Sequence, residues 1–451
     1  MEREKLSSRL GFILLSAGCA IGVGNVWKFP YVVGENGGGI FVLIYIFFLL
    51  ILGIPVLTME FSLGRAAKKS PVKLYQELEP KGSKWHIHGY ISMLGNYILM
   101  MFYTTVAGWM LAYFYHMLMG DFNGLNPEGV ALRFDELLSS PWEMIVFTAI
   151  IIILGFFICS KGLKNGIEKA SKVMMISLLV IMLALALNSF FLEGGLEGLK
   201  FYLLPNMARV KEIGILNVMV KAMNQAFFTL SIGMGSMAIF GSYIDRNRAL
   251  LGEAVNVTAL DTFVAITSGL IIFPACFAYG VNVNSGPKLI FVTLPNIFNH
   301  LPLGHLWGSL FFLFMTFAAF STVLAVFECI VACTTDLFNI SRKKACSINL
   351  ILILILSLPC ILGFNVLSGF NPLGPNTTIL DLEDFLVSNL ILPLGSLCYV
   401  IFIMSKHGWS FETFKQEANI GKGLKVQDWM KPYLKYGLPL IIILVFIIGI
   451  I

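Results

Sequence analysis

The sequence predicts an all-α polytopic membrane protein, with a 5+5 inverted repeat of spanning helices and one further helix. Hydrophobic residues make up 57% of the 451 positions and charged residues 13%, and the mean hydropathy is +0.83. This composition excludes an ordinary soluble domain. Apolar runs of spanning length recur along the chain, and two of them are interrupted by glycine-rich breaks, at residues 18–25 and 231–235.

Runs of about 20 apolar residues, the length that crosses a bilayer, predict eleven spans. These are residues 10–31, 39–63, 88–119, 142–160, 168–192, 214–242, 254–281, 305–338, 347–364, 381–405 and 433–451. The longest polar stretch, residues 406–432, is expected to be a basic inner loop with helical pieces such as 411–417. No separate soluble domain is expected, so residues 1–451 are interpreted as a single transmembrane domain.

Basic residues are distributed unevenly between the predicted loops. With a cytoplasmic N-terminus, 24 of the 31 Lys and Arg residues lie inside and 7 outside, as the positive-inside rule expects. An odd number of spans then puts the C-terminus outside. The net charge of +5 is explained by inner loops that face anionic lipid headgroups, so no nucleic-acid partner is expected. The eight cysteines lie in or beside apolar spans and show no disulfide framework.

The two broken spans are the first and the sixth, so each opens a set of five. Because an odd repeat length inverts the second copy, residues 10–192 and 214–405 are predicted to be inverted repeats, with 433–451 outside the symmetry. A break within the bilayer leaves main-chain groups that lipid cannot satisfy. Gly18 and Gly22 also suit close helix packing, but paired breaks at corresponding positions favour a transported solute with coupling ions.

A dehydrated sodium ion is a hard cation that prefers oxygen ligands. The carbonyls around Gly18, Ala20 and Ile21 are candidate ligands, with the amide oxygen of Asn25 one turn later. In the eighth span, Ala318, Ser321 and Thr322 share one helix face. Such a Ser–Thr pair also commonly bonds its own helix backbone, and both interpretations stay open.

Polar residues near the second break suggest where a substrate would bind. Thr229 and Ser231 flank this break, and the adjoining half-helix N-termini favour an anionic group such as a carboxylate. Tyr103 is either a donor to that carboxylate or a core residue. Asp261 and Glu328 are acids within spans, which indicates either a functional role or a hydrogen-bonded acid inside the bundle.

The chain resembles the neurotransmitter:sodium symporters, specifically the bacterial amino-acid branch with eleven spans. The likeness covers essentially all residues and rests on 18–30 (GCAIGVGNVWKFP), 35–41 (ENGGGIF), 225–235 (QAFFTLSIGMG) and 318–322 (AAFST). It implies a leucine-transporter-like (LeuT-like) fold with helices 1 and 6 broken. It also implies sodium-coupled uptake of an amino acid by alternating access. The roles of the family's site residues are carried over only to positions where the residues match.

By this resemblance, two sodium ions and no organic cofactor are expected. The first sodium site would comprise Ala20, Asn25, Thr229, Asp261 and the substrate carboxylate. The second would comprise Gly18, Ile21, Ala318, Ser321 and Thr322. The substrate pocket would be formed by Ala20, Gly22, Gly24, Leu99, Tyr103, Phe228, Thr229, Ser231, Met234, Thr322 and Val326.

The resemblance also carries expectations about the substrate. Amine carriers of the family place an acid where Gly22 stands, so its absence here favours amino acids. Met234 and Val326 would line the side-chain end of the pocket, and methionine is a deformable wall residue. Hydrophobic or aromatic L-amino acids are therefore predicted, with tyrosine, tryptophan, phenylalanine and leucine as candidates.

Two gates are expected from the family. The outer gate would pair Lys28 with Asp384, chosen from Asp381, Glu383 and Asp384, although lysine lacks the planar fork of arginine. The inner latch would pair Arg3 with Asp336, supported by the hydroxyls of Ser242 and Tyr243. Leu6 stands near the place of a tryptophan common in the family.

Chloride independence is the remaining expectation from the family. Relatives that need chloride bind it near Tyr45, Gln225 and Ser231, with neutral groups on the seventh helix. This chain has Asp261 on that helix and Ala265 one turn on, and a fixed carboxylate can balance the charge of sodium. Asp261 could also take up a proton on the return step.

Two functions other than sodium symport stay open. A proton-coupled or exchange-type amino-acid carrier would not need Asn25, Thr229 and Ser321 as ion ligands, and a non-transporting membrane amino-acid sensor would be favoured by a long soluble domain. No enzyme is expected, because no nucleophile, metal or phosphate motif has supporting context.

The expected location is the plasma membrane, as a bacterial inner-membrane protein. The expected partners are an amino acid, Na⁺ and the lipid bilayer, and the oligomeric state is left open between monomer and dimer.

Overall fold

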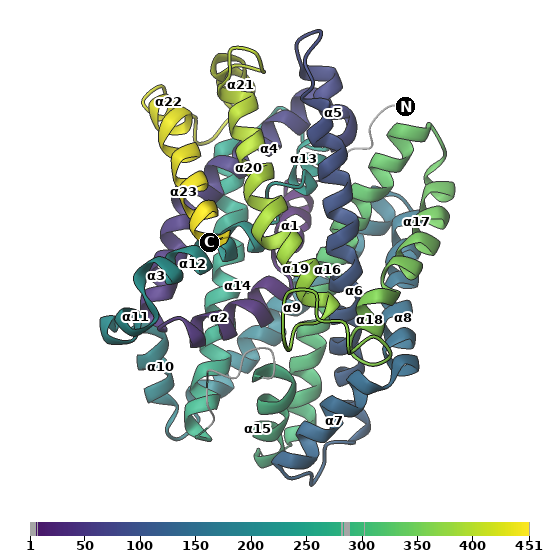
Figure 1. The fold of residues 1–451 in the computed structure, drawn as a ribbon, viewed down its shortest axis with the longest axis vertical. Helices are drawn as coiled ribbons and strands as arrows, with labels where there is room; N and C mark the ends of the chain where they lie inside the picture. The colour runs from purple at the N-terminus through teal and green to yellow at the C-terminus, as the bar shows by residue number, and fades with distance from the viewer. Residues whose placement is uncertain (1–5, 7, 281–282, 284–288, 302, 451) are drawn as a thin grey trace.

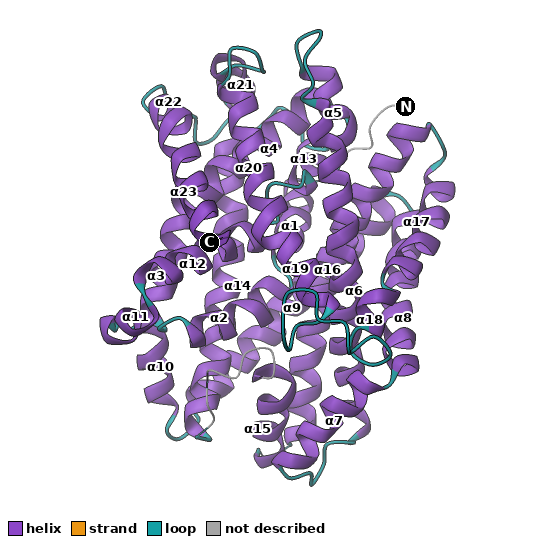
Figure 2. Ribbon diagram, in the orientation of Figure 1, coloured by secondary structure: helices purple, strands orange, loops and turns teal. Residues whose placement is uncertain are grey.

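The computed structural model describes the chain except residues 1–5, 7, 281–282, 284–288, 302 and 451. Within the described residues, every regular element is a helix (Figure 2). In this described part of the chain, nine helices are long and apolar enough to cross a membrane, and a pair bent by 52°, Arg9–Ala20 with Gly24–Glu35, makes a tenth. The sixth predicted span is present as two shorter helices separated by residues 230–235. The all-helical membrane architecture expected from the sequence is therefore confirmed.

The first five spans follow the predicted order. They are α1 (Arg9–Ala20), η1 (Gly24–Lys28) and α2 (Phe29–Glu35); α3 (Gly39–Phe48), η2 (Leu49–Gly53) and α4 (Ile54–Ala67); α6 (His86–Met119); α8 (Pro141–Ser160); and η3 (Leu163–Glu168) with α9 (Lys169–Phe190). The η segments are single π-helical turns, which interrupt long helices and are common at functional sites.

The next six spans complete the bundle. They are α12 (Ile215–Thr229) and α13 (Ser236–Gly241); α14 (Leu250–Ala278); α16 (Gly304–Phe338); α17 (Arg342–Leu356) and α18 (Leu358–Leu362); α19 (Ile379–Phe385), η5 (Leu386–Ile391) and α20 (Leu392–Met404); and α22 (Met430–Pro432), η6 (Tyr433–Gly437) and α23 (Leu438–Ile450). In α16, 83% of the most apolar window is buried, against 22% in the last span. The eighth span is thus central and the eleventh peripheral.

Several loop helices lie at the two ends of the bundle. In Figure 1, α5 (Pro71–Leu78) and α21 (Phe411–Ala418) lie at the top, whereas α7 (Pro127–Ser139), α10 (Gly195–Leu203) and α15 (Leu294–His300) lie at the bottom. This is the separation expected for predicted inner and outer loops. The assignment of one end to the cytoplasm, and the repeat boundaries at 10–192 and 214–405, stay predictions.

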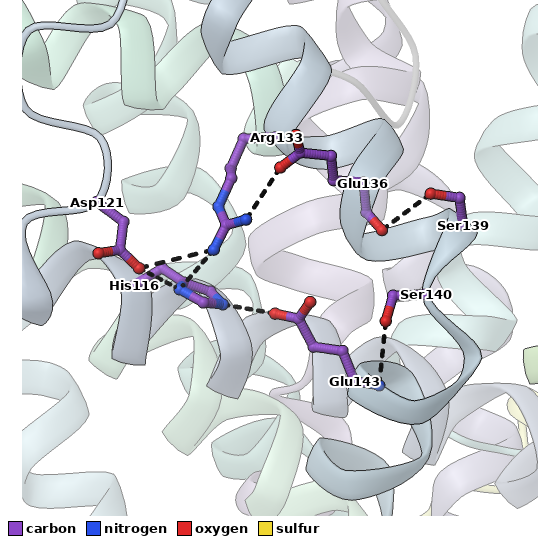
Figure 3. Close-up of polar contacts among 7 residues, drawn as sticks. All are labelled: His116, Asp121, Arg133, Glu136, Ser139, Ser140 and Glu143. Atoms are coloured by element: carbon purple, nitrogen blue, oxygen red, sulfur yellow. Dashed lines mark hydrogen bonds and ion pairs between the residues drawn. The ribbon is translucent and has the colours of Figure 1, made fainter.

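A polar cluster fastens the loop between the third and fourth spans (Figure 3). His116, near the end of α6, lies with Nδ1 2.6 Å from Asp121 Oδ2 and Nε2 2.6 Å from Glu143 Oε1 at the start of α8. Arg133 of α7 donates to Glu136 Oε2 at 3.0 Å and lies 3.1 Å from His116 Nδ1. These contacts tie α6, α7 and α8 together at the predicted outer end.

Candidate functional site

The two chain breaks lie against each other. Ser231 in the second break donates its hydroxyl to the carbonyl of Cys19 at the end of α1, at 3.2 Å. Gln225, one turn before the second break, donates to the carbonyl of Gly24 at 2.7 Å. Main-chain carbonyls at the first break are therefore reached by side chains at and just before the second.

Glycine is needed where the second break turns. Gly233 and Gly235 have φ of +100° and +76°, and between them the chain leaves and re-enters helical form. A side chain at either position would be strained. At Gly233 a Cβ would also meet the carbonyl of Leu392 in the tenth span. The glycines of this motif thus allow the bent chain to pack directly against α20.

Asp261 of α14 lies between the two breaks. Asn25 Nδ2 donates to its Oδ1 at 2.8 Å, and the Thr229 hydroxyl donates to the same oxygen at 3.1 Å. The hydroxyl of Tyr45 lies 3.5 Å from Oδ2. Asp261 is 0% exposed, and no ion pair among the described residues includes it. A buried carboxylate is thus surrounded by neutral groups.

Oxygens of the second predicted sodium site also converge. The Ser321 hydroxyl lies 3.2 Å from the Ile21 carbonyl and 2.8 Å from that of Ala318. The Thr322 hydroxyl lies 3.3 Å from the Gly18 carbonyl and 3.4 Å from that of Ile21. The Ser321 hydroxyl therefore lies within hydrogen-bond distance of its own helix backbone and of the carbonyl that follows α1, and its role as a sodium ligand stays a prediction.

A small cavity lies beside these clusters. Eight of the predicted pocket residues line it, namely Ala20, Gly24, Leu99, Tyr103, Phe228, Ser231, Met234 and Thr322. Cys19, Val387 and Leu392 also line it and were not foreseen. Gly22, Thr229 and Val326 are buried but are not among its lining residues. Val326 was expected at the side-chain end of the pocket by the family resemblance, and the tenth span contributes Val387 and Leu392 to the lining.

Gly22 lies directly behind the cavity. A Cβ there would overlap the hydroxyls of Tyr103 and Thr322. Tyr103 in turn accepts a hydrogen bond from the Val23 main-chain N–H at 2.8 Å, so its oxygen caps one of the N–H groups freed by the first break. The contact leaves the phenol proton available to another acceptor.

Glu60 of α4 is a site residue that the sequence reasoning missed. It is 0% exposed, and its Oε1 accepts the Gly233 main-chain N–H at 2.5 Å. The second break thus has a carboxylate acceptor for one of its free N–H groups. A single acid inside the apolar run 39–63 was the signal that could have found it.

The structure joins the two residues expected at the outer gate. Lys28 Nζ donates to both carboxylate oxygens of Asp384 at 2.8 Å and to the Ser388 hydroxyl at 3.1 Å. It also lies 4.2 Å from the ring centre of Phe228, which lines the cavity. An ion pair therefore sits beside the cavity, on the side of α2 and α19.

The inner latch expected at the other end of the bundle stays a prediction. Arg3 lies outside the described residues, and Asp336 accepts the Ser70 main-chain N–H at 2.8 Å. Arg9 at the start of α1 pairs with Glu253 of α14 at 3.0 Å.

Glu328 belongs to the same end of the bundle. It accepts the Tyr243 hydroxyl at 2.5 Å and Arg342 Nη1 at 3.0 Å. The hydroxyl of Ser242, expected with that of Tyr243 to support the inner latch, donates to the Ile239 carbonyl at 2.6 Å. Glu328 is thus a hydrogen-bonded, ion-paired acid inside the bundle, the structural one of its two interpretations.

Comparisons with known proteins place this geometry among transporters. The model of the family described as "Sodium:neurotransmitter symporter family" matches residues 3–123 and 130–451. The sodium-dependent transporter YhdH of Bacillus subtilis (strain 168) is 34% identical over 443 residues, which cover 98% of this chain and 96% of that protein. The sodium- and chloride-dependent GABA transporter ine of Drosophila melanogaster is 24% identical, over 93% of this chain and 48% of that protein.

A solved structure is similar throughout. The crystal structure of MhsT in complex with L-phenylalanine matches with a TM-score of 0.90 and 37% sequence identity. The match covers 99% of this chain and 100% of MhsT. The structural similarity therefore extends over nearly the whole chain, including both breaks.

Proposed function

Because this chain belongs to the sodium:neurotransmitter symporter family, we propose that it carries a hydrophobic or aromatic L-amino acid into the cell with two sodium ions, by alternating access and without chloride. Family membership makes it a sodium-dependent, multi-pass membrane transporter with a LeuT-like fold, and not an enzyme. The substrate, the ion number, the chloride independence and the inward direction are the proposed parts.

The buried carboxylate of Asp261 is the observation that carries the proposal. A charge taken out of water without a counter-charge is costly, and the groups that contact Asp261 are neutral. A sodium ion beside Asn25, Thr229 and Asp261 would supply the missing positive charge. The Ala20 carbonyl and the substrate carboxylate would complete its oxygen ligands.

The second sodium ion would bind between α1 and α16. The Ser321 hydroxyl lies within hydrogen-bond distance of the Ile21 and Ala318 carbonyls, and the Thr322 hydroxyl within that of the Gly18 and Ile21 carbonyls. Several uncharged oxygens around one point suit a monovalent hard cation. The ion would bridge the first break to the central helix.

Sharing a ligand supplies the coupling. If the substrate carboxylate coordinates the first sodium ion, each one raises the affinity for the other by the same factor. Alternating access then requires the outer side to close over the bound pair. The ion pair between Lys28 and Asp384 next to the cavity is suited to hold that closed state.

The apolar residues that line the cavity are evidence for a substrate with an apolar side chain. Leu99, Met234, Val387 and Leu392 line it, and none of them carries a charged or hydrogen-bonding side chain. MhsT, which is 37% identical, was solved with L-phenylalanine. Phenylalanine, tyrosine, tryptophan and leucine are thus the first substrates to test.

Chloride independence rests on the same carboxylate. Asp261 already balances one sodium charge where relatives that need chloride have neutral groups, and Ala265, one turn on, adds no polar group. Once sodium leaves, a fully buried carboxylate without a cation is unfavourable. We propose that Asp261 then takes up a proton, which the return step would carry outward.

Transport by purified protein in proteoliposomes tests the proposal. With an inward sodium gradient, labelled phenylalanine or leucine should accumulate above the outside concentration. Uptake should be lost when choline replaces sodium and retained when gluconate replaces chloride. Equilibration without accumulation would exclude sodium symport, and accumulation driven by a proton gradient in choline would favour the proton-coupled carrier.

A further inference from the structure

Asn96 of α6 connects the substrate-lining part of that helix to the second break. It lies one turn before Leu99 and two turns before Tyr103, so these side chains share a helix face. Asn96 is 1% exposed. Its Nδ2 donates to the Met234 carbonyl at 2.9 Å, and its Oδ1 accepts the Ser236 hydroxyl at 2.8 Å.

These bonds hold the break where helical bonding stops. Met234 and Ser236 lie on either side of Gly235, the residue before α13. A carbonyl in a broken span has no solvent donor, and Asn96 supplies one for Met234. The second N–H of the Asn96 amide donates to the Ser92 carbonyl at 2.7 Å, which fixes the rotamer of the amide on its own helix.

The neighbouring residue lets α6 come close enough for this contact. A Cβ on Gly95 would lie 2.8 Å from Ile391 Cγ2 and 3.1 Å from Met234 Sδ. The third span, the second break and the tenth span therefore meet at Gly95. Met234 and Leu392, from two of these segments, line the cavity.

We propose that Asn96 is a positioning residue that sets the substrate preference of this pocket, by holding the main chain of Met234. Methionine is flexible, so how far its side chain enters the pocket depends on where its backbone is held. The inference rests on the proposed function, because it concerns the same pocket and an apolar amino-acid substrate.

Kinetics of purified variants in proteoliposomes test this role. Asn96→Ala leaves the Met234 carbonyl without its donor, and the KM for phenylalanine should rise about tenfold, the worth of one buried hydrogen bond. The KM for the smaller valine should change much less, and the Vmax per carrier molecule should be retained. Asn96→Asp has nearly the same size, but its carboxylate has no N–H group to donate, so it should resemble Asn96→Ala.

Tyr97→Phe is the matched control. Tyr97 is the next residue on α6, but its hydroxyl donates to Asn349 of α17 at 2.5 Å, away from the break. Its loss removes one hydrogen bond from the same helix and should leave the ratio of the two KM values unchanged. A shift in Tyr97→Phe equal to that in Asn96→Ala would reduce the role of Asn96 to general helix packing and overturn the proposal.

A second variant keeps the test independent of folding. Ser236→Ala removes only the contact to Asn96 Oδ1, and should shift the phenylalanine-to-valine KM ratio in the same direction by a smaller factor. An equal fall in Vmax for both substrates, with unchanged KM values in all variants, would contradict a role in preference. Failure of the unmodified protein to take up either substrate with sodium would instead reject the proposed function.

Discussion

Lys28 and Asp384, 356 positions apart in the chain, meet as an ion pair with the lysine nitrogen 2.8 Å from both carboxylate oxygens. Ser388 braces the pair, donating to Asp384 Oδ1 at 2.6 Å. Lysine offers three donors on a flexible stem and not the fixed fork of arginine. Here the position of the flexible lysine is fixed by two further contacts. Ser388 contacts both partners of the ion pair, and the Phe228 ring lies beneath the ammonium group.

Asp384→Asn should slow uptake. The change removes the charge that attracts Lys28, and a partly exposed pair of this kind is worth about 1 kcal/mol, or about fivefold in the closing equilibrium. Lys28→Arg keeps the charge and should keep the rate. Initial uptake of labelled phenylalanine measures both. Asp381→Asn is the control, because Asp381 contacts Thr378 and not Lys28; equal slowing in both variants would argue against the gate.

Ser321→Ala should weaken sodium activation. The alanine removes one oxygen from the cluster between α1 and α16, and the sodium concentration for half-maximal uptake should rise about tenfold. Thr316→Val is the matched control, since Thr316 lies on the same helix and bonds only the Phe312 carbonyl. Sodium titration of uptake reads out both variants, and an unchanged midpoint in Ser321→Ala would mean that the second ion binds elsewhere.

Asp261→Asn or Asp261→Ser should make uptake depend on chloride. Either change removes the negative charge that balances sodium but keeps polar groups near Tyr45 and Gln225. Uptake should then fall strongly in gluconate medium and recover with chloride, whereas the unmodified protein should be indifferent. Equal activity of the variants in both media would count against charge substitution.

Met234→Phe should shift the preference towards smaller aliphatic substrates. Met234 lines the cavity, and a rigid ring in its place fills volume that a bulky substrate side chain needs. A competition screen of the twenty amino acids against one labelled substrate gives the ranking. If leucine, phenylalanine and tryptophan keep their order relative to valine, the side-chain wall lies elsewhere.

Some of the site residues could be predicted from the sequence and others could not. The breaks, the cluster of Ser321 and Thr322, and the pairing of Lys28 with Asp384 were each expected, because glycine runs, helical spacing and family motifs are visible in one dimension. Val326 was expected in the pocket wall and is buried outside it, with Val387 and Leu392 in that wall. The expected latch partner Arg3 lies outside the described residues, and Asp336 contacts Ser70.

The sequence by itself determined that the chain is a membrane bundle with two broken spans, since hydrophobic length and glycine-rich interruption are local properties of a helix. Only the tertiary structure decided which atoms occupy the breaks. Asp261 meets Asn25 across 236 positions, Glu60 meets Gly233 across 173, and Asn96 meets Met234 across 138. Helix packing brings these groups together because main-chain groups freed inside a bilayer must find partners on other spans.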